Sequence, residues 1–94
     1  MRVIPKSFTI MGNDITVKRV AHLTSDANAY GNWDESSLEI QIQSEKEGVS
    51  QDNLLRAFWH EAMHSVDDTL SLGLKHKDID RIGQAIHQIL KTKR

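Results

Sequence analysis

The sequence has no cysteine and a single proline in a chain of 94 residues. Without cysteine the chain cannot form a disulfide framework, a thiolate zinc finger or a thiolate-held iron–sulfur cluster, and it has no cysteine nucleophile. Any bound metal must therefore be held by histidines and carboxylates. The scarcity of proline, with 38% hydrophobic and 27% charged residues, is typical of a folded globular protein and excludes a collagen-like repeat.

Long apolar runs and a strong excess of either charge are also missing. No stretch approaches the roughly 18 apolar residues of a membrane span, and the N-terminal segment MRVIPKSFTI lacks the apolar run of a signal peptide. We therefore expect a cytoplasmic protein. The formal net charge is −1, and we interpret the basic residues Lys91, Lys93 and Arg94 as a solvated terminus. We expect neither a membrane nor a nucleic acid as a partner.

The first half of the chain alternates apolar and polar residues, which indicates strands. Ser7–Ile10 and Ile15–Val20 predict a β-hairpin around a glycine-containing turn. Leu38–Gln43 predicts a third strand, and Gly31–Asp34 before it has the composition of a turn. Residues 27–30 fit either a further short strand or a turn.

The second half has the apolar spacing of helices. Ser50 is a suitable N-cap for a helix over residues 51–71, which Gly73 ends, and a second helix is predicted over residues 76–91. The first helix presents an apolar stripe to the sheet, made of Leu55, Phe58, Trp59, Ala62, Met63, Val66 and Leu70. The second carries an apolar face that we expect to pack on the first, made of Ile79, Ile82, Ile86, Ile89 and Leu90.

These elements predict an α+β fold. We expect a small antiparallel sheet of about three strands, from the N-terminal half, packed against two helices. One domain spans residues 1–94, because a usual domain has roughly 100 to 150 residues and a second core would not fit.

The pattern HExxH occurs at residues 60–64, in the middle of the first predicted helix. Two histidines four residues apart lie on one helix face, so His60 and His64 can bind one tetrahedral Zn²⁺. Glu61 lies about 100° further round the helix, where it can act as the general base toward a zinc-activated water. The histidines point away from the apolar stripe, which argues against ordinary core histidines. The motif predicts one zinc ion per chain.

A zinc site needs a third protein ligand, and the second predicted helix offers two candidates. His76 and Asp80 fall on one flank of this helix together with Gly83 and His87. His76 and Asp80 compete for the metal. Gly83 is either the point where the helices approach most closely around the site or an ordinary packing glycine.

Three further polar residues lie either near the site or at the surface. Asp67 and Asp68 follow His64 closely and are candidates to accept hydrogen bonds from the ligand imidazoles, with solvated surface carboxylates as the alternative. His22 has no identifiable partner, and we interpret it as a surface histidine.

Several segments together resemble the small zincin-like metallopeptidases of phages and prophages, related to the ImmA/IrrE and SprT-like families. The resemblance covers nearly the whole chain, and its most specific part is HExxH. It lies in Ile4–Phe8, in Gly31–Asp34 before Leu38–Gln43, in Phe58–His64, and in Ile79–Leu90 with its His87-Gln88 pair.

The resemblance implies a minimal zincin with a three-stranded sheet and an active-site helix that supplies His60, Glu61 and His64. It places the third metal ligand on the following helix. Where such families commonly carry glutamate, this chain has His76, and Asp80 is the alternative ligand.

The leading hypothesis is a zinc-dependent metallopeptidase that hydrolyses a peptide or protein substrate. In zincins the strand nearest the active-site helix binds an extended substrate, and Leu38–Gln43 is the expected edge. A protein partner or a homo-oligomer would complete the cleft, because 94 residues cannot supply the far wall that larger zincins build. The alternative is a non-catalytic binding protein stabilised by zinc. A metal-dependent nuclease ranks third, since only the basic terminus favours it.

Overall fold

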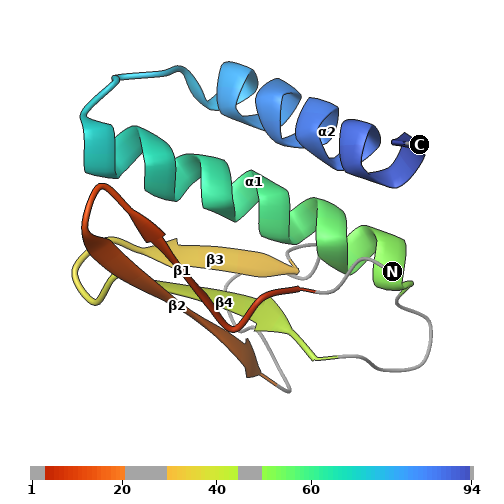
Figure 1. Ribbon diagram of the computed structural model, residues 1–94, viewed down its shortest axis with the longest axis horizontal. Coiled ribbons are helices and arrows are strands. Elements are labelled where there is room, and N and C mark those ends of the chain that lie inside the picture. Colours follow the sequence, from red (N-terminus) through yellow and green to blue (C-terminus); the bar gives the residue numbers. More distant parts are fainter. Residues whose placement is uncertain (1–3, 21–29, 45–49, 94) are drawn as a thin grey trace.

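The computed structural model describes residues 4–20, 30–44 and 50–93, which form one sheet and two helices. Helix α1 lies across one face of the sheet, and α2 lies on the far side of α1 (Figure 1). The fold is therefore α+β, as predicted. The elements, in chain order, are β1 (Ser7–Ile10), β2 (Asn13–Val20), β3 (Gly31–Asp34), β4 (Glu39–Gln43), α1 (Gln51–Leu70) and α2 (His76–Thr92).

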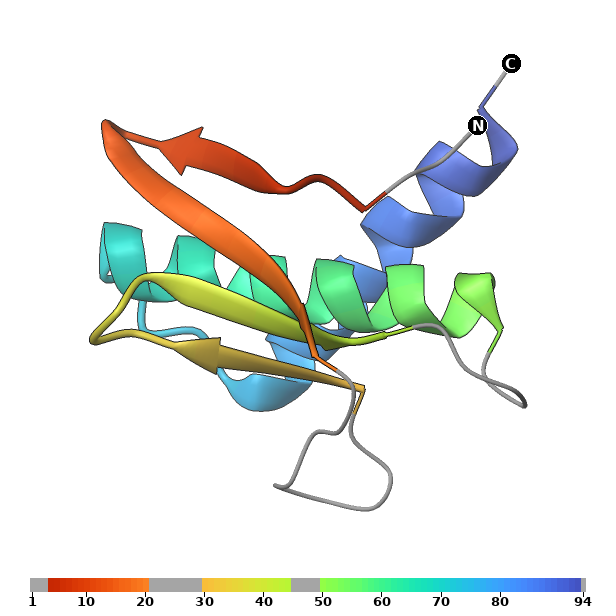
Figure 2. The ribbon, with the colours of Figure 1, turned by 90° about the horizontal axis from the view of Figure 1, so that it is seen from below.

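The sheet has four strands in the order β1-β2-β4-β3 over the described residues. Strands β1 and β2 form one antiparallel hairpin, and β3 and β4 form another. The hairpins join through β2 and β4, which run parallel, so the predicted all-antiparallel sheet is wrong at this pair. The physical reason is that Gly31–Asp34 forms a strand, β3, which reverses the chain direction before β4, so that β4 runs parallel to β2. The full burial of Ile40 and Ile42 fits the central place of β4 in the sheet. The order is visible in Figure 2.

The segment Gly31–Asp34 is a strand, and its prediction as a turn is wrong. Trp33 pairs with Ile40 across the hairpin and packs against the core, which outweighs the turn-like composition around it. The turn lies just after it, where the Asp34 carboxylate accepts hydrogen bonds from the Ser36 backbone N–H (3.0 Å) and hydroxyl (2.7 Å). Within residues 27–30, positions 27–29 lie outside the described part of the chain.

Helix α1 begins and ends through local hydrogen bonds. The Ser50 hydroxyl accepts a hydrogen bond from the Asn53 N–H (3.1 Å), which confirms the predicted N-cap. The helix ends at Leu70, one residue before the predicted end. Ser71 already adopts a left-handed conformation (φ 54°), and Leu72 N–H donates back to the Asp67 carbonyl (3.0 Å).

The core lies between the sheet and α1. Its fully or nearly fully buried members are Ile4, Ile15, Val17, Ile40, Ile42, Leu54, Leu55, Phe58 and Ala62. Leu54 belongs to this core although the predicted stripe omitted it, whereas Leu70 is 42% exposed and lies outside it. Neither helix is long and apolar enough to cross a membrane, as judged over the described residues.

Helix α2 packs on α1 through a narrower face than predicted. Ile79, Gly83 and His87 are buried there, but Ile82 and Ile89 are exposed, so their predicted contact with α1 is wrong. Gly83 explains the rotation of α2. A Cβ added at this glycine would lie 3.1 Å from the Cα of His60, so a side chain here would push the two helix backbones apart by a few tenths of an ångström.

Candidate metal site

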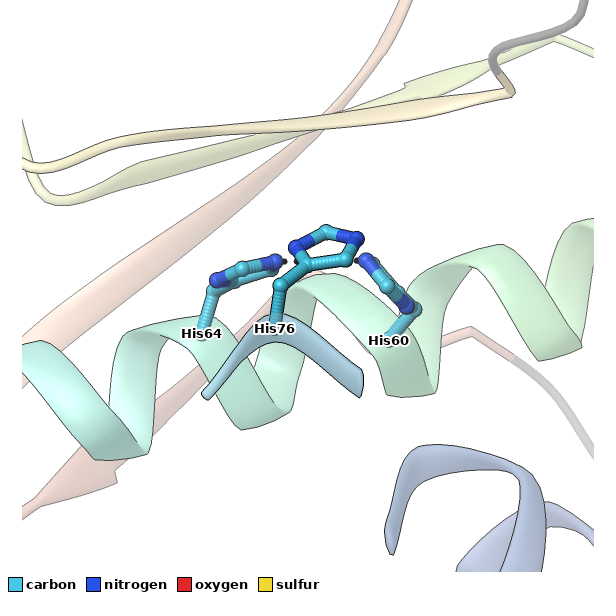
Figure 3. Close-up of side chains that lie close together, drawn as sticks. All are labelled: His60, His64 and His76. Carbon is cyan, nitrogen blue, oxygen red and sulfur yellow. Dashed lines mark hydrogen bonds between the residues drawn. The ribbon is translucent and has the colours of Figure 1, made fainter. Parts of the chain in front are cut away.

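Three histidines from the two helices lie together in space. His60 and His64 lie one turn apart on α1, and His76 is the first residue of α2 (Figure 3). One ring nitrogen from each lies within 4.8 Å of the others. The Nε2 atoms of His60 and His64 are 3.2 Å apart, close to the spacing of about 3.3 Å that zinc–nitrogen bonds of about 2.0–2.1 Å impose in a tetrahedron. The set therefore has the composition of a three-histidine metal site, and the His60–His64 pair has the spacing that a shared metal ion would impose.

Asp80 lies behind His60, against the nitrogen that points away from the other rings. Its Oδ1 is 3.1 Å from His60 Nδ1, and its Oδ2 accepts a hydrogen bond from the Gln84 side chain (2.8 Å). A proton on Nδ1 that is donated to Asp80 leaves the lone pair of Nε2 facing the histidine set. Of the two candidates for the third ligand, the structure brings His76 to the other rings and places Asp80 where it orients His60.

The connection between the helices brings His76 to α1, and two aspartates of α1 form hydrogen bonds with neighbouring segments. Asp67 Oδ1 accepts a hydrogen bond from the Leu74 backbone N–H (2.9 Å), and Asp68 Oδ2 accepts one from the Trp33 indole (2.6 Å). These carboxylates were predicted to bond to a ligand imidazole or to be solvated. They instead fasten the interhelical connection and β3 to the C-terminal end of α1.

The surroundings of His64 favour its uncharged ring. Its pKa is lowered mainly by burial and further by positive charge on His60 and His76, while Asp68 and Asp67 act in the opposite direction. A neutral imidazole keeps the lone pair that binds a metal.

Glu61 lies on α1 beside this set and close to the start of β3. Burial raises the pKa of Glu61 to about 7, whereas a divalent cation nearby would act in the opposite direction. A Cβ added at Gly31 would lie 3.0 Å from Glu61 Cγ and 3.1 Å from Ile42 Cδ1. The glycine thus allows β3 to pass directly beside the carboxyl group.

A groove of about 380 Å³ opens beside Glu61. The start of β3 forms one wall and the first half of α2 forms part of another; its lining residues include Tyr30, Gly31, His60, Glu61 and Asp80. The strand at the sheet edge here is β3. The predicted edge Leu38–Gln43 is wrong, because that segment contains β4, which lies between β2 and β3.

Another predicted position, His87, lies away from the three rings. His87 faces α1, as its place in the row with His76 indicated, but it is buried near the other end of α2 and its Nε2 lies 3.0 Å from Asp52 Oδ1. His22 lies outside the described residues. Gly31 and Tyr30 were missed as groove residues, since no local pattern links a strand to a helix about 30 residues later in the chain.

Within the described residues, histidines, a carboxyl group and a groove thus coincide at one site. Its parts come from β3, α1 and α2, and the core on the other side of α1 holds the middle element in place. No protein family, curated protein or solved structure matches this chain, and the functional argument therefore depends on these residues.

Proposed function

We propose that the protein is a zinc-dependent peptidase, with water as the nucleophile and Glu61 as the general base. The observation that carries the proposal is the set of His60, His64 and His76, whose ring nitrogens lie within 4.8 Å of one another beside a groove that Glu61 lines. A cytoplasmic location is part of the proposal, since a chain without cysteine needs no oxidising compartment.

The donor set suits zinc. Three imidazole ligands leave a fourth tetrahedral position open, as catalytic zinc sites do. Zinc bound there would polarise a carbonyl and lower the pKa of a water to about 7. The chain's own residues supply the rest. Asp80 orients His60 through a 3.1 Å contact, and the close approach of the helices at Gly83 fixes the start of α2 relative to α1.

The position of Glu61 supports a role in proton transfer. It follows His60 directly, projects into the groove and has no part in the three-histidine set. As the general base it takes a proton from the attacking water, and it then gives a proton to the leaving amine. Water is the nucleophile because the chain has no cysteine and the described residues that line the groove include no serine or threonine.

An extended peptide fits the surroundings of the site. Strand β3 is the edge strand beside the groove, and an edge offers backbone N–H and C=O groups to a segment that adds as a further strand. Gly31 brings this edge next to Glu61. The substrate class that follows is an unfolded or extended polypeptide segment.

The test compares two variants with the wild type on an unfolded, fluorescently labelled protein. We expect Glu61→Gln to keep about one zinc per chain and to lose at least about 100-fold in cleavage rate, because only the base is removed. His60→Ala should lose both zinc and cleavage. Zinc is measured by mass spectrometry of protein made without an affinity tag. Full cleavage by Glu61→Gln would exclude this mechanism.

A non-catalytic zinc-stabilised protein is the second candidate, and the contact between the helices favours it. This contact contains a glycine and two histidine–aspartate pairs, so a zinc ion bound by both helices would add substantially to their association. It predicts that zinc raises the melting temperature strongly while no substrate is cut. The wild-type assay above separates the two candidates.

A further inference from the structure

The groove beside Glu61 has one side chain with a permanent positive charge among the described residues that line it, and this is Arg56. Arg56 lies on α1, one turn before His60, and is exposed. It forms no hydrogen bond or ion pair with another described residue. An unpaired guanidinium in a groove can bind a carboxylate that a ligand brings.

The acidic residues closest to Arg56 along the two helices have other partners. Asp52, one turn before Arg56 on α1, forms an ion pair with Lys91 of α2 (3.2 Å). Asp80, on the α2 wall of the groove, contacts a ring nitrogen of the histidine set (3.1 Å). Glu61 lies beside β3, about 140° round α1 from Arg56. The charge of Arg56 is therefore left for a molecule that enters the groove.

Strand β3 and helix α1 run in the same direction past the groove (Figures 1 and 2). Gly31 lies beside Glu61, and the Trp33 indole donates a hydrogen bond to Asp68 (2.6 Å), so later residues of β3 meet later residues of α1. A peptide that adds to the edge of β3 therefore also follows α1. Beyond the start of β3 it reaches the turn of α1 that carries Arg56.

Arg56 lies a few peptide residues away from the histidine set. It is about 6 Å before His60 along the helix axis, and its long side chain leans further toward the start of α1. An extended chain advances about 3.3 Å per residue. The guanidinium therefore meets a substrate group about two to four residues from the bond that lies at the metal.

We propose that the groove selects peptide segments that carry a carboxylate at this distance from the scissile bond, and that Arg56 binds this carboxylate. The inference rests on the proposed peptidase function and names its substrate class. The carboxylate is either an acidic side chain or the C-terminus of the substrate, because both present the same two acceptor oxygens.

The neighbouring polar side chain at this end of the groove also suits a carboxylate. Asn53, three residues before Arg56, lines the groove, and no described residue bonds to its side-chain amide. An amide N–H and a guanidinium together can satisfy both oxygens of one carboxylate. A lysine side chain of the substrate would instead meet the positive charge of Arg56, so basic segments should bind less tightly.

The first test measures binding without cleavage, by fluorescence anisotropy of short labelled peptides on Glu61→Gln protein supplied with zinc. One pair of amidated peptides differs by Glu against Gln at a central position, and a second pair differs by a free against an amidated C-terminus. We expect about 5-fold tighter binding of the carboxylate form in at least one pair. The first pair reports an acidic side chain and the second a C-terminus. Equal affinities within both pairs would overturn the proposal.

The second test assigns the preference to one residue. Arg56→Glu, added to the same protein, should abolish or reverse the preference, because like charges then meet in the groove. Arg81→Glu is the matched control, since it makes the same charge change at an exposed position of α2 outside the groove, and it should keep the preference. A preference that survives Arg56→Glu, as binding by the zinc itself would, or that Arg81→Glu removes equally, would contradict the assignment.

Cleavage by the protein with Glu61 intact separates this inference from the proposed function. Cleavage of all peptides at equal rates would overturn the carboxylate preference and leave the peptidase in place. Binding of the carboxylate peptides through Arg56 without any cleavage would support the carboxylate site and overturn the peptidase.

Discussion

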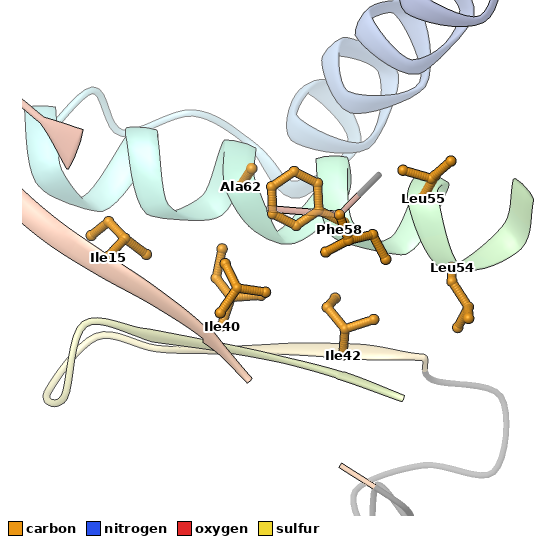
Figure 4. Close-up of a cluster of buried hydrophobic side chains, with 9 residues drawn as sticks. Ile15, Ile40, Ile42, Leu54, Leu55, Phe58 and Ala62 are labelled. Carbon is orange, nitrogen blue, oxygen red and sulfur yellow. The ribbon is translucent and has the colours of Figure 1, made fainter. Parts of the chain in front are cut away.

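The two sides of α1 are built from different chemistry. The side toward the sheet buries Leu54, Leu55, Phe58 and Ala62 among isoleucines of β2 and β4 (Figure 4). On the side toward α2, Gly83 of α2 lies against the His60 backbone. Two polar pairs between the helices flank this contact: His60 with Asp80, and Asp52 with His87.

The sheet side of α1 supplies most of the stability of the fold, whereas the α2 side sets the geometry of the site. Burial of a large apolar side chain contributes about 1.5–3 kcal/mol, so most of the fold's stability comes from the sheet side. A polar pair contributes less, but it holds each group in one orientation. Substitutions on the sheet side should therefore act on unfolding, and substitutions on the α2 side should act mainly on metal binding.

The largest expected effect is on the sheet side. Phe58 is 2% exposed and packs edge-on against Phe8 and Trp59. Phe58→Ala should lower the free energy of unfolding by about 3–5 kcal/mol, measured by urea denaturation of the metal-free protein. Met11→Ala, at an exposed turn, should change it by less than about 0.5 kcal/mol. A loss under about 1 kcal/mol for Phe58→Ala would contradict the position of the core.

A larger side chain between the helices should reduce both the stability of the fold and the affinity for zinc. Gly83→Leu should lower the free energy of unfolding by about 1–3 kcal/mol, although leucine is the better helix former, because the new side chain meets the His60 backbone. It should also weaken zinc binding, since α2 carries His76. Gln88→Leu, on an exposed position of the same helix, is the control. Unchanged zinc affinity in Gly83→Leu would show that the helix spacing does not set the site.

Loss of the carboxylate behind His60 should weaken zinc binding with little effect on folding. Asp80→Asn keeps the shape but removes the charge that orients the ring, and we expect zinc affinity to fall about 10- to 100-fold. Competition with a chromophoric chelator measures it. Asp78→Asn, on the same helix but away from the rings, should bind zinc like the wild type. If Asp80→Asn abolishes binding while His76→Ala retains it, then Asp80 is the third ligand and His76 is not.

The smallest expected effect is on the pH dependence of stability, through Asp52 near the start of α1. The pKa of Asp52 is lowered by its hydrogen bond to Lys91 (3.2 Å) and then by that to His87 (3.0 Å). Because the folded pKa lies below the unfolded one, the stabilisation is present above about pH 4 and is lost as pH falls through the folded pKa. Asp52 is 41% exposed, so we expect under about 1 kcal/mol.

Melting temperatures of the wild type and Asp52→Asn, measured at several pH values, test this expectation. The wild type should melt higher at neutral pH, and the difference should shrink in acid. A difference that stays constant down to acidic pH would mean that the Asp52 charge is not its source.

Prediction from the sequence succeeded where the relevant forces act within a few residues. The helix start at Ser50 and the presence of both helices follow from capping and from apolar spacing, and the structure confirms them. It failed at Gly31–Asp34, where pairing with β4 outweighs a turn-like composition, and at Ile82 and Ile89 of α2, which are exposed instead of packing on α1.

The sequence by itself determined that His60, Glu61 and His64 project from neighbouring positions of one helix, because this placement needs only the helical repeat. Only the tertiary structure decided that His76 joins the two histidines while Asp80 lies behind one of them. It also decided that β3 is the edge beside Glu61. The physical reason is that the rotation of a helix and the order of strands depend on contacts between distant segments, such as Gly83 against the His60 backbone.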